Sequence, residues 1–399
     1  MSRRFGWLFL LGCLAVVSPA AGQSKPLGFA IVEQSVDLRA DEATLISARR
    51  LSLNKRFTEL RQFRVPLPDG RIYEARKLRD PWPSGMTEFY GALYESGRQR
   101  GWITYVADEE GIEGTITIDQ PFRQYQIETL PGRGTWLVEK DIRRDSAEGC
   151  GVLTADEPIS THLRAERAPA NDTKVVTAKI LLLYSPEAGK AFGSKAIKKK
   201  FANLLKGVNK AYSESGTYLK FQLAGVVEWT GYEELGDSRE DARLLLKALE
   251  NQESQEILNR YRADLVALVV KEPGVTRARA YQLQRPGQFP SGIPSVYGYK
   301  DTDVRTFAHE LGHNLGADHE PGNTDRRENQ WPYAFGHQVP GKFSSLMAYW
   351  NHCDPYCLPW LPWLSNPELS YEGLPLGIAN ERDNRQVVNN NRRAVASIR

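Results

Sequence analysis

Hydrophobic and polar positions are spaced differently in the two halves of this 399-residue chain. Between about residues 87 and 141, short β-branched or aromatic segments alternate in part with polar residues, and glycine, proline and acidic turns separate them. A repeat of two residues is typical of β-strands, so this part predicts an antiparallel β domain. Its clearest strand candidates are residues 88–94, 102–106, 114–118 and 135–138.

The second half combines short apolar runs with helical spacing. Apolar residues recur at helical intervals over 197–212 and again over 242–257, and a helix-like segment lies near 381–398. The order strand, helix, strand, helix, strand predicts a twisted sheet with helices packed on it. The expected buried strands are residues 178–184, 221–227 and 265–270.

The N-terminal segment has the layout of a secretory signal peptide. Arg3 and Arg4 precede an apolar run at 5–17, and small residues follow up to Gly22. We therefore expect residues 1–22 to be removed and the protein to be secreted, to the extracellular space or the periplasm. The alternative is a lipoprotein anchored at Cys13. No second long apolar run follows, so we expect no stable membrane insertion after signal removal.

Residues 142–173 lose the strand pattern and are polar and basic, which predicts an exposed linker that proteases can cut. We therefore expect three parts, at 1–22, 23–173 and 174–399. The composition, 41% hydrophobic and 25% charged, is that of folded domains. A net charge of +3 gives no support to nucleic-acid binding. The oligomeric state stays open.

Three of the six histidines fall within residues 309–319. His309 and His313 are four residues apart, so on a helix both imidazoles lie on one side and can reach one ion. His319 could not join them on a continuous helix, and Gly316 is placed where a residue with positive φ can redirect the chain. Three neutral imidazoles with an open fourth position predict a catalytic site for one Zn²⁺.

Glu310 follows the first of these histidines directly. Its side chain is expected about 100° around the helix from His309, beside the metal rather than on it. That position suits a general base. Zinc lowers the pKa of bound water to about 7, and Glu310 would take the proton and pass it to the leaving amine.

The segment His-Glu-Leu-Gly-His-Asn-Leu-Gly, followed by His319, resembles the zinc signature of metzincin peptidases and is most similar to the reprolysin (adamalysin) branch. The resemblance covers roughly residues 174–399. It implies an α+β or α/β catalytic domain, with a twisted mixed sheet, helices and zinc in a cleft, preceded by a β-rich propeptide domain. Glu320 departs from the Asp of adamalysins and matches astacins. The short C-terminal part favours a minimal secreted member of microbial type.

Two further residues take their expected roles from this resemblance. Met347 lies 28 residues after His319, where metzincins carry a methionine turn, which implies an apolar floor under the three histidines. Tyr349 matches a tyrosine that astacin-like and serralysin-like relatives place near zinc. The resemblance implies a fifth ligand or an oxyanion-stabilising group, and a packed aromatic residue is the alternative.

Removal of the signal peptide leaves three cysteines. Cys353 and Cys357 share one loop and predict a disulfide, and the alternative is a second metal site with His352. Cys150 is then unpaired. Its Cys-Gly-Val context is similar to adamalysin propeptides, which implies a thiolate that occupies the zinc and holds the enzyme latent. An intermolecular disulfide or an inert buried cysteine are the alternatives.

Two segments are candidates for the substrate path. Family likeness places a substrate-aligning edge strand within residues 276–300, where a peptide would add by main-chain hydrogen bonds. The loop at 350–363 either walls a specificity pocket or is an aromatic surface loop pinned by the disulfide.

These features predict a secreted zinc metalloendopeptidase that is made as a latent zymogen and acts on proteins or peptides. The alternatives are a zinc-bearing binding protein without catalysis and a zinc hydrolase of non-protein amides. Calcium binding, cleavage preference and natural substrate stay open.

Overall fold

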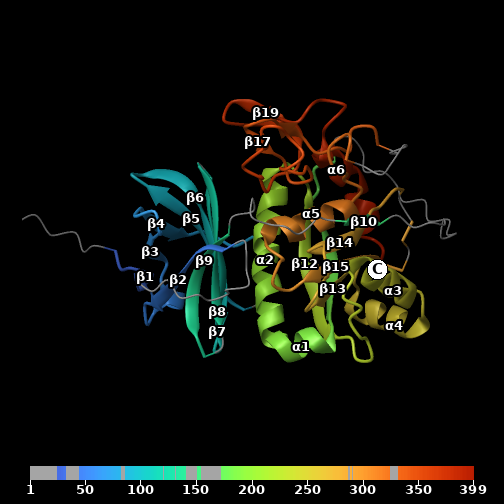
Figure 1. Cartoon of the computed structure of the whole chain (residues 1–399), viewed down its shortest axis with the longest axis horizontal. Coiled ribbons are helices and arrows are strands. Elements are labelled where there is room, and N and C mark those ends of the chain that lie inside the picture. The colour runs from blue at the N-terminus through green and yellow to red at the C-terminus, as the bar shows by residue number, and fades with distance from the viewer. Residues whose placement is uncertain are drawn as a thin grey trace, which may run out of the picture.

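The structure, a computed structural model, describes residues 25–32, 45–81, 86–119, 121–130, 132–140, 151–153, 172–285, 288–289, 291–323 and 331–399. The predicted signal peptide, Cys13 and Cys150 lie outside these residues. Figure 1 shows a β domain on one side, an α/β domain on the other, and helix α2 between them. Within the described residues, no helix is long and apolar enough to cross a membrane.

The first domain is an antiparallel sheet of nine strands in the order β1-β2-β9-β8-β7-β6-β5-β4-β3. A bridge between Leu27 and Arg64 joins the two ends of the sheet, so we call this domain the N-terminal barrel. Its core is apolar and rich in aromatic rings. The strands are β1 (Phe29–Val32), β2 (Leu45–Leu53), β3 (Gln62–Pro66), β4 (Ile72–Lys77), β5 (Thr87–Glu95), β6 (Arg98–Asp108), β7 (Gly111–Asp119), β8 (Phe122–Leu130) and β9 (Gly134–Lys140).

The antiparallel prediction is confirmed for β5, β6, β7 and β9, but the barrel contains more strands than expected. Strands β1 to β4 precede residue 87, and β8 lies within the predicted β region but was not among the strand candidates named. These strands are short or carry charged residues at the outward positions, as in the burial pattern of β3. Their apolar positions are therefore too few to stand out from the sequence.

The second domain contains a six-stranded mixed sheet in the order β10-β14-β15-β13-β11-β12. The pairs β11/β12, β11/β13, β13/β15 and β10/β14 are parallel, and β14/β15 is antiparallel. The strands are β10 (Gly151–Leu153), β11 (Val176–Tyr184), β12 (Leu219–Glu228), β13 (Leu265–Val270), β14 (Ala278–Tyr281) and β15 (Ile293–Gly298). The predicted twisted sheet with helices is thus present.

The helices lie on both faces of this sheet. The chain passes from β11 to β12 and then back across β11 to β13, and right-handed crossovers in opposite directions put their helices on opposite faces. Accordingly α2 and α5 cover one face and α3 packs on the other (Figure 1). The helices are α1 (Pro186–Phe192), α2 (Ser194–Glu214), α3 (Ser238–Leu249), α4 (Gln252–Tyr261), α5 (Val304–Asn314) and α6 (Asn384–Val395).

Two expectations about this half were wrong in detail. The single helix expected over 242–257 is two helices, because Asn251 caps a new one by accepting a hydrogen bond from the main-chain N–H of Ser254. Residues 151–153, expected to belong to a linker, form β10 on the edge of the sheet. The remaining small elements are η1 (Phe57–Glu59), β16 (Gln338–Val339), β17 (Phe343–Ser344), β18 (Asn366–Tyr371) and β19 (Leu374–Leu376).

Candidate metal centre

Helix α5 carries the first two predicted ligands. Asp303 caps its first turn, because the carboxylate accepts a hydrogen bond from the main-chain N–H of Thr306 at 2.8 Å. Every residue from Val304 to Asn314 is buried. The polar side chains of α5 must therefore find partners inside the protein.

The helix ends in a glycine turn, as the sequence predicts. Gly316 has a φ of 91°. Its N–H donates to the carbonyl of His313 at 2.9 Å, and the N–H of Ala317 donates to the carbonyl of Gly312 at 3.0 Å. These are the two bonds of a Schellman motif. A Cβ at Gly316 would lie 2.6 Å from a packed tryptophan ring, so both the conformation and the space require glycine.

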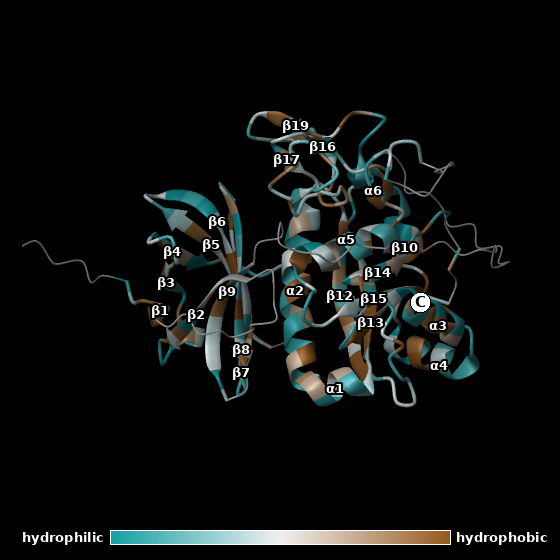
Figure 2. Cartoon of the chain, viewed as in Figure 1, coloured by the Kyte–Doolittle hydropathy of each residue, from teal (hydrophilic) through white to brown (hydrophobic). Residues whose placement is uncertain are grey.

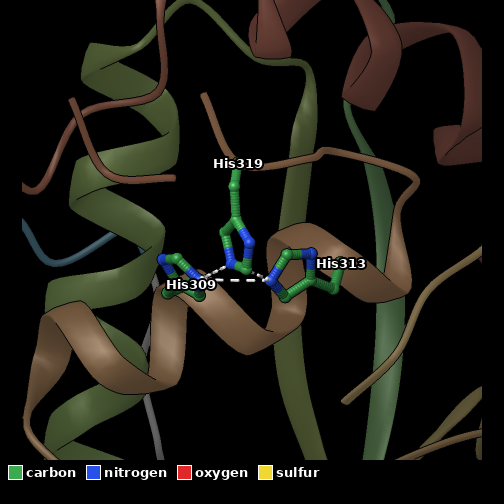
Figure 3. Close-up of side chains that lie close together, drawn as sticks. All are labelled: His309, His313 and His319. Atoms are coloured by element: carbon green, nitrogen blue, oxygen red, sulfur yellow. Dashed lines mark hydrogen bonds between the residues drawn. The ribbon is translucent and has the colours of Figure 1, made fainter. Parts of the chain in front are cut away.

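After this turn His319 meets the two helical histidines. The Nε2 atoms of His309, His313 and His319 form a triangle with three sides of 3.1 Å. Figure 3 shows two rings projecting from α5 and the third reaching them from the following loop. Among the described residues, these three buried side chains are the only cluster of three or more potential metal ligands.

Hydrogen bonds to the main chain fix the tautomer of each imidazole. Every Nδ1 lies next to a carbonyl oxygen, which can only accept. Each Nδ1 therefore carries the ring proton, and each Nε2 presents a lone pair to the centre of the triangle. Three lone pairs at this separation repel one another unless a cation lies among them. The carbonyls are those of Leu346 for His309 (2.8 Å), Ala317 for His313 (2.9 Å) and Asn323 for His319 (3.3 Å).

The donor set fits Zn²⁺. Nitrogen ligands at about 2.0–2.1 Å in a tetrahedron are roughly 3.3 Å apart, close to the observed 3.1 Å. Burial, with His319 adding to it, lowers the pKa of His309 to about 3, so this imidazole is in the neutral form that binds metals. Three protein ligands leave a fourth position for water or substrate, which is the pattern of catalytic zinc sites.

The candidate base is fully buried on the same helix. Glu310 has no exposed surface and directly follows His309 on α5. A carboxylate is expensive to bury and is not needed to shape a helix, so its place next to the metal ligands favours a chemical role.

Comparisons with known proteins agree with this centre. Residues 174–355 match the family model Reprolysin_5, metallo-peptidase family M12. A relative from Stenotrophomonas maltophilia (strain R551-3), named peptidyl-Asp metalloendopeptidase, is 25% identical over 97% of this chain and 93% of its own length. One of the same name from Xanthomonas campestris pv. campestris is 27% identical over 71% of this chain and 67% of its own.

The chain is a zinc metalloendopeptidase, and its residues 174–355 are similar to the reprolysin-like metallopeptidases. Among solved structures, metalloproteinase-II from Bacteroides fragilis is 12% identical with a TM-score of 0.38, over 62% of this chain and 78% of that one. That likeness is too weak to bear on the site of the metallopeptidase.

Met347 packs against the helix of the metallopeptidase between the two helical histidines. It is fully buried, and a Cβ added to Gly312 would lie 2.5 Å from its sulfur. The glycine of the His-Glu-Leu-Gly-His segment is therefore needed to admit the thioether. This contact places Met347 against α5 and explains a glycine that the sequence left unexplained, while its role as an apolar floor under the three histidines stays a prediction.

Glu320 connects the loop of His319 to the turn of Met347. One carboxylate oxygen accepts a hydrogen bond from the main-chain N–H of Tyr349 at 2.9 Å, and the other lies 3.4 Å from Nδ1 of His352. Burial raises the pKa of Glu320, and the Tyr349 N–H and His352 oppose this. The acidic residue that departed from the adamalysin pattern thus has a structural function that the sequence did not reveal.

Tyr349 lies beside the ligands of the metallopeptidase. Its ring centroid is 4.3 Å from that of His319 and 6.2 Å from that of His309. The phenol therefore borders the centre, and its predicted part in catalysis stays a prediction.

The loop after this turn is pinned as expected. Cys353 and Cys357 form a disulfide with Cα atoms 5.6 Å apart, which confirms the predicted pair. Sequence reasoning missed Trp360 in the same loop. Its indole N–H donates to the carbonyl of Leu346, the group that also orients His309, and its ring lies 6.0 Å from that imidazole. The aromatic loop therefore supports the first ligand from behind.

Segment 276–300 contains β14 and β15, and neither is the edge strand expected there, because β10 pairs with β14 on its outer side. The N–H of Leu283, just beyond β14, donates to the carbonyl of His313 at 3.0 Å. Asn314 donates from its side chain to the carbonyl of Tyr281 at 2.8 Å. Strand β14 is thus attached directly to the helix that carries the ligands.

Proposed function

We propose that this metalloendopeptidase is exported as a latent precursor and cleaves peptide bonds with Glu310 as general base. The observation that carries the proposal is the convergence of three Nε2 lone pairs at the helix that also carries the buried Glu310. His309, His313 and His319 would hold a Zn²⁺ ion, whose chemistry would be to polarise the peptide carbonyl and acidify the attacking water. Glu310 would accept the proton of that water and return it to the leaving amine.

The replacement Glu310→Gln tests the mechanism. It keeps the size of the side chain but removes its basicity, so kcat/KM on an unfolded protein falls by about a thousandfold or more. Metal analysis still finds one zinc per chain. Glu253→Gln, on the exposed side of α4, is the matched control and leaves turnover unchanged. Retained hydrolysis in Glu310→Gln would overturn the assigned base, and hydrolysis of small amides alone would favour the non-protein alternative.

The edge of the sheet supports the proposed latency. Strand β10 begins one residue after Cys150 and pairs in parallel with β14. The carbonyl of Leu153 accepts from the N–H of Gln282 at 3.0 Å, and the next residue along, Leu283, bonds to His313. The segment that follows Cys150 therefore uses the edge on which a substrate strand would add. This supports a thiolate of Cys150 within reach of the metal, although Cys150 itself lies outside the described residues.

We extend the proposal to a preference for aspartate, which the names of the relatives state for those proteins. Arg305 lies one helical turn before His309 on α5 and is buried. Its guanidinium carbon is 5.1 Å from the ring centroid of Trp360, whose other neighbour is His309. A cation this close to the metal ligands would attract an acidic side chain next to the cleaved bond.

Arg305 is oriented by its neighbour Asp303, which accepts a hydrogen bond from the guanidinium at 3.0 Å. Burial alone would raise the pKa of Asp303, but Arg305, the Thr306 N–H and Arg277 together lower it to about 2. The carboxylate therefore stays ionised and holds the guanidinium of Arg305 beside Trp360.

A further inference from the structure

Helix α2 has two buried faces of opposite character. One face is apolar and packs toward the sheet and α5. The opposite face carries polar residues at intervals of four, three and four, so they form one stripe. Figure 2 shows hydrophilic and hydrophobic residues mixed along α2 beside the N-terminal barrel. The members of this stripe, which we call the α2 lysine stripe, are Lys199, Asn203, Lys206 and Lys210, all buried.

Two lysines of the stripe pair with carboxylates of the N-terminal domain, whereas Lys210 pairs with Glu214 of the same helix. Lys206, with its side chain 1% exposed, contacts both Asp80 and Glu88, the latter at 2.9 Å. Lys199, 4% exposed, lies 2.5 Å from Asp108 at the end of β6. These are desolvated pairs, in which a charge left alone is far more costly than the pair itself.

The neutral member of the stripe is also satisfied by the barrel. The amide of Asn203 accepts from the hydroxyl of Thr104 on β6 and donates to that of Thr115 on β7, both at 3.0 Å. Lys210 lies 5.4 Å from the ring centroid of Trp102. Thr104 and Trp102 alternate with residues that point into the barrel core, so the outer face of β6 is complementary to α2.

This contact has the character of a separable interface. Its buried groups are charged or polar and regain favourable hydration when exposed, unlike the apolar face of the same helix. A cavity of about 410 Å³ lies at the seam, lined by Pro81 and Met86 from the barrel side and by Ala202, Asn209 and β12 from the other. The two domains therefore leave open space between them here, in contrast to the close packing of a domain core.

A second contact lies at the start of β8. Phe122 packs against an apolar cluster of the C-terminal segment and lies 5.8 Å from the guanidinium carbon of Arg305. The barrel therefore touches α2 and the surroundings of the metal centre at once. The cluster consists of Phe343, Leu361, Tyr371 and Leu376.

From these contacts we propose that the α2 lysine stripe is a docking surface for the N-terminal barrel, and that the barrel stays bound there noncovalently after the chain is cut. The proposal takes from the proposed function only that cutting occurs between Leu153 and Asp172. Cutting alone then does not free the catalytic domain, and removal of the barrel is a separate event that salt favours.

The test uses the full chain with Glu310→Gln, so that no self-cleavage occurs. A recognition sequence for a specific protease is placed between Leu153 and Asp172 in one version and between Lys140 and Gly151 in another. The second version leaves β10 with the catalytic piece. After complete cutting, both pairs of pieces co-elute in 50 mM NaCl, and their Kd rises roughly tenfold in 500 mM NaCl.

Three variants of each version distinguish the stripe from general destabilisation. Lys206→Ala leaves two buried carboxylates without their cation and raises the Kd about a hundredfold or more. Lys195→Ala is the matched control on the same helix, because Lys195 pairs with two exposed residues, Glu109 and Glu110, and its loss changes the Kd less than about threefold. Exchanging Lys199 and Asp108 for each other restores binding that either single change weakens.

Separation of the wild-type pieces in 50 mM NaCl would overturn the proposal. So would equal effects of Lys206→Ala and Lys195→Ala, or co-elution only in the version in which β10 remains on the barrel piece. None of these measurements depends on hydrolysis. Docking without peptidase activity would therefore count against the proposed function alone, and activity with freely separating pieces would count against the docking surface alone.

Discussion

Two buried polar regions of this metallopeptidase are held in different ways. At the metal centre, each histidine Nδ1 donates to a main-chain carbonyl of the same domain. Along the α2 lysine stripe, Lys199, Asn203 and Lys206 pair with side chains of another domain. A main-chain partner cannot leave without local unfolding, whereas two sets of side chains can separate as the domains part. The first region is therefore fixed by the fold, and the second is suited to release.

The same difference assigns the two proposed causes of latency to different regions. In the proposed precursor, Cys150 would act at the fixed region by occupying the metal, and the barrel would act at the separable one. A substitution in one region should therefore leave the structure and binding of the other region intact.

Of the changes that separate these two regions, Cys150→Ser on the uncut chain has the largest expected effect. A thiolate tethered near the metal competes with water at high effective concentration, so its removal raises peptide hydrolysis by about a hundredfold. The measurement is the hydrolysis of a fluorogenic peptide by full-length protein whose linker resists cleavage. The linker is checked to be intact after the assay. Gel filtration of the same sample should still show the barrel docked. Unchanged latency would show that the thiolate does not inhibit the enzyme and that the N-terminal barrel alone blocks the site.

Arg305 lies where the two regions meet, between Trp360 of the catalytic domain and Phe122 of the barrel. We expect Arg305→Gln to lower kcat/KM for an aspartate peptide about tenfold to hundredfold, because a charged hydrogen bond is lost. The matched asparagine peptide serves as internal control and changes little, so the ratio of the two separates recognition from damage. An equal loss on both peptides would assign Arg305 a structural function through Asp303.

Much of the centre was predictable because its ligands are local in sequence. The spacing of His309 and His313, and a glycine before His319, determine a helix and a turn whose geometry follows from elementary rules. Main-chain partners such as the carbonyl of Leu346 were not predictable, since they depend on tertiary packing. The edge strand and the aromatic loop were expected only from the family resemblance. The histidine tautomers could not be predicted, because they depend on which carbonyl each Nδ1 contacts in the folded protein.

The α2 helix shows what the sequence could not reveal elsewhere. Its pattern of apolar residues at 197–212 correctly predicted an amphipathic helix, and a row of lysines opposite such a face ordinarily indicates a solvated surface. The lysines are buried because another domain supplies carboxylates at matching positions. Complementarity between distant segments leaves no periodic signal, and for the same reason Asp80 and Asp108 attracted no attention in the sequence.

The smallest expected effect is that of Gly312→Ala on the free energy of unfolding. This substitution affects only the metal centre. At an open helix position this change stabilises by about 1 kcal/mol, because alanine is the better helix former. Here the new Cβ would lie 2.5 Å from the sulfur of Met347, which is fully buried and cannot swing aside. We expect a net loss of about 1–3 kcal/mol in the free energy of unfolding, measured by denaturant titration with zinc saturating.

The background Met347→Ala completes a double-mutant cycle with this glycine. Once the thioether is absent, Gly312→Ala should cost nothing or stabilise slightly, because only the helix preference remains. The same cost in both backgrounds would show that the glycine is required for another reason. In neither background should the affinity of the cut barrel change, since Gly312 faces Met347 inside the catalytic domain and not the α2 lysine stripe.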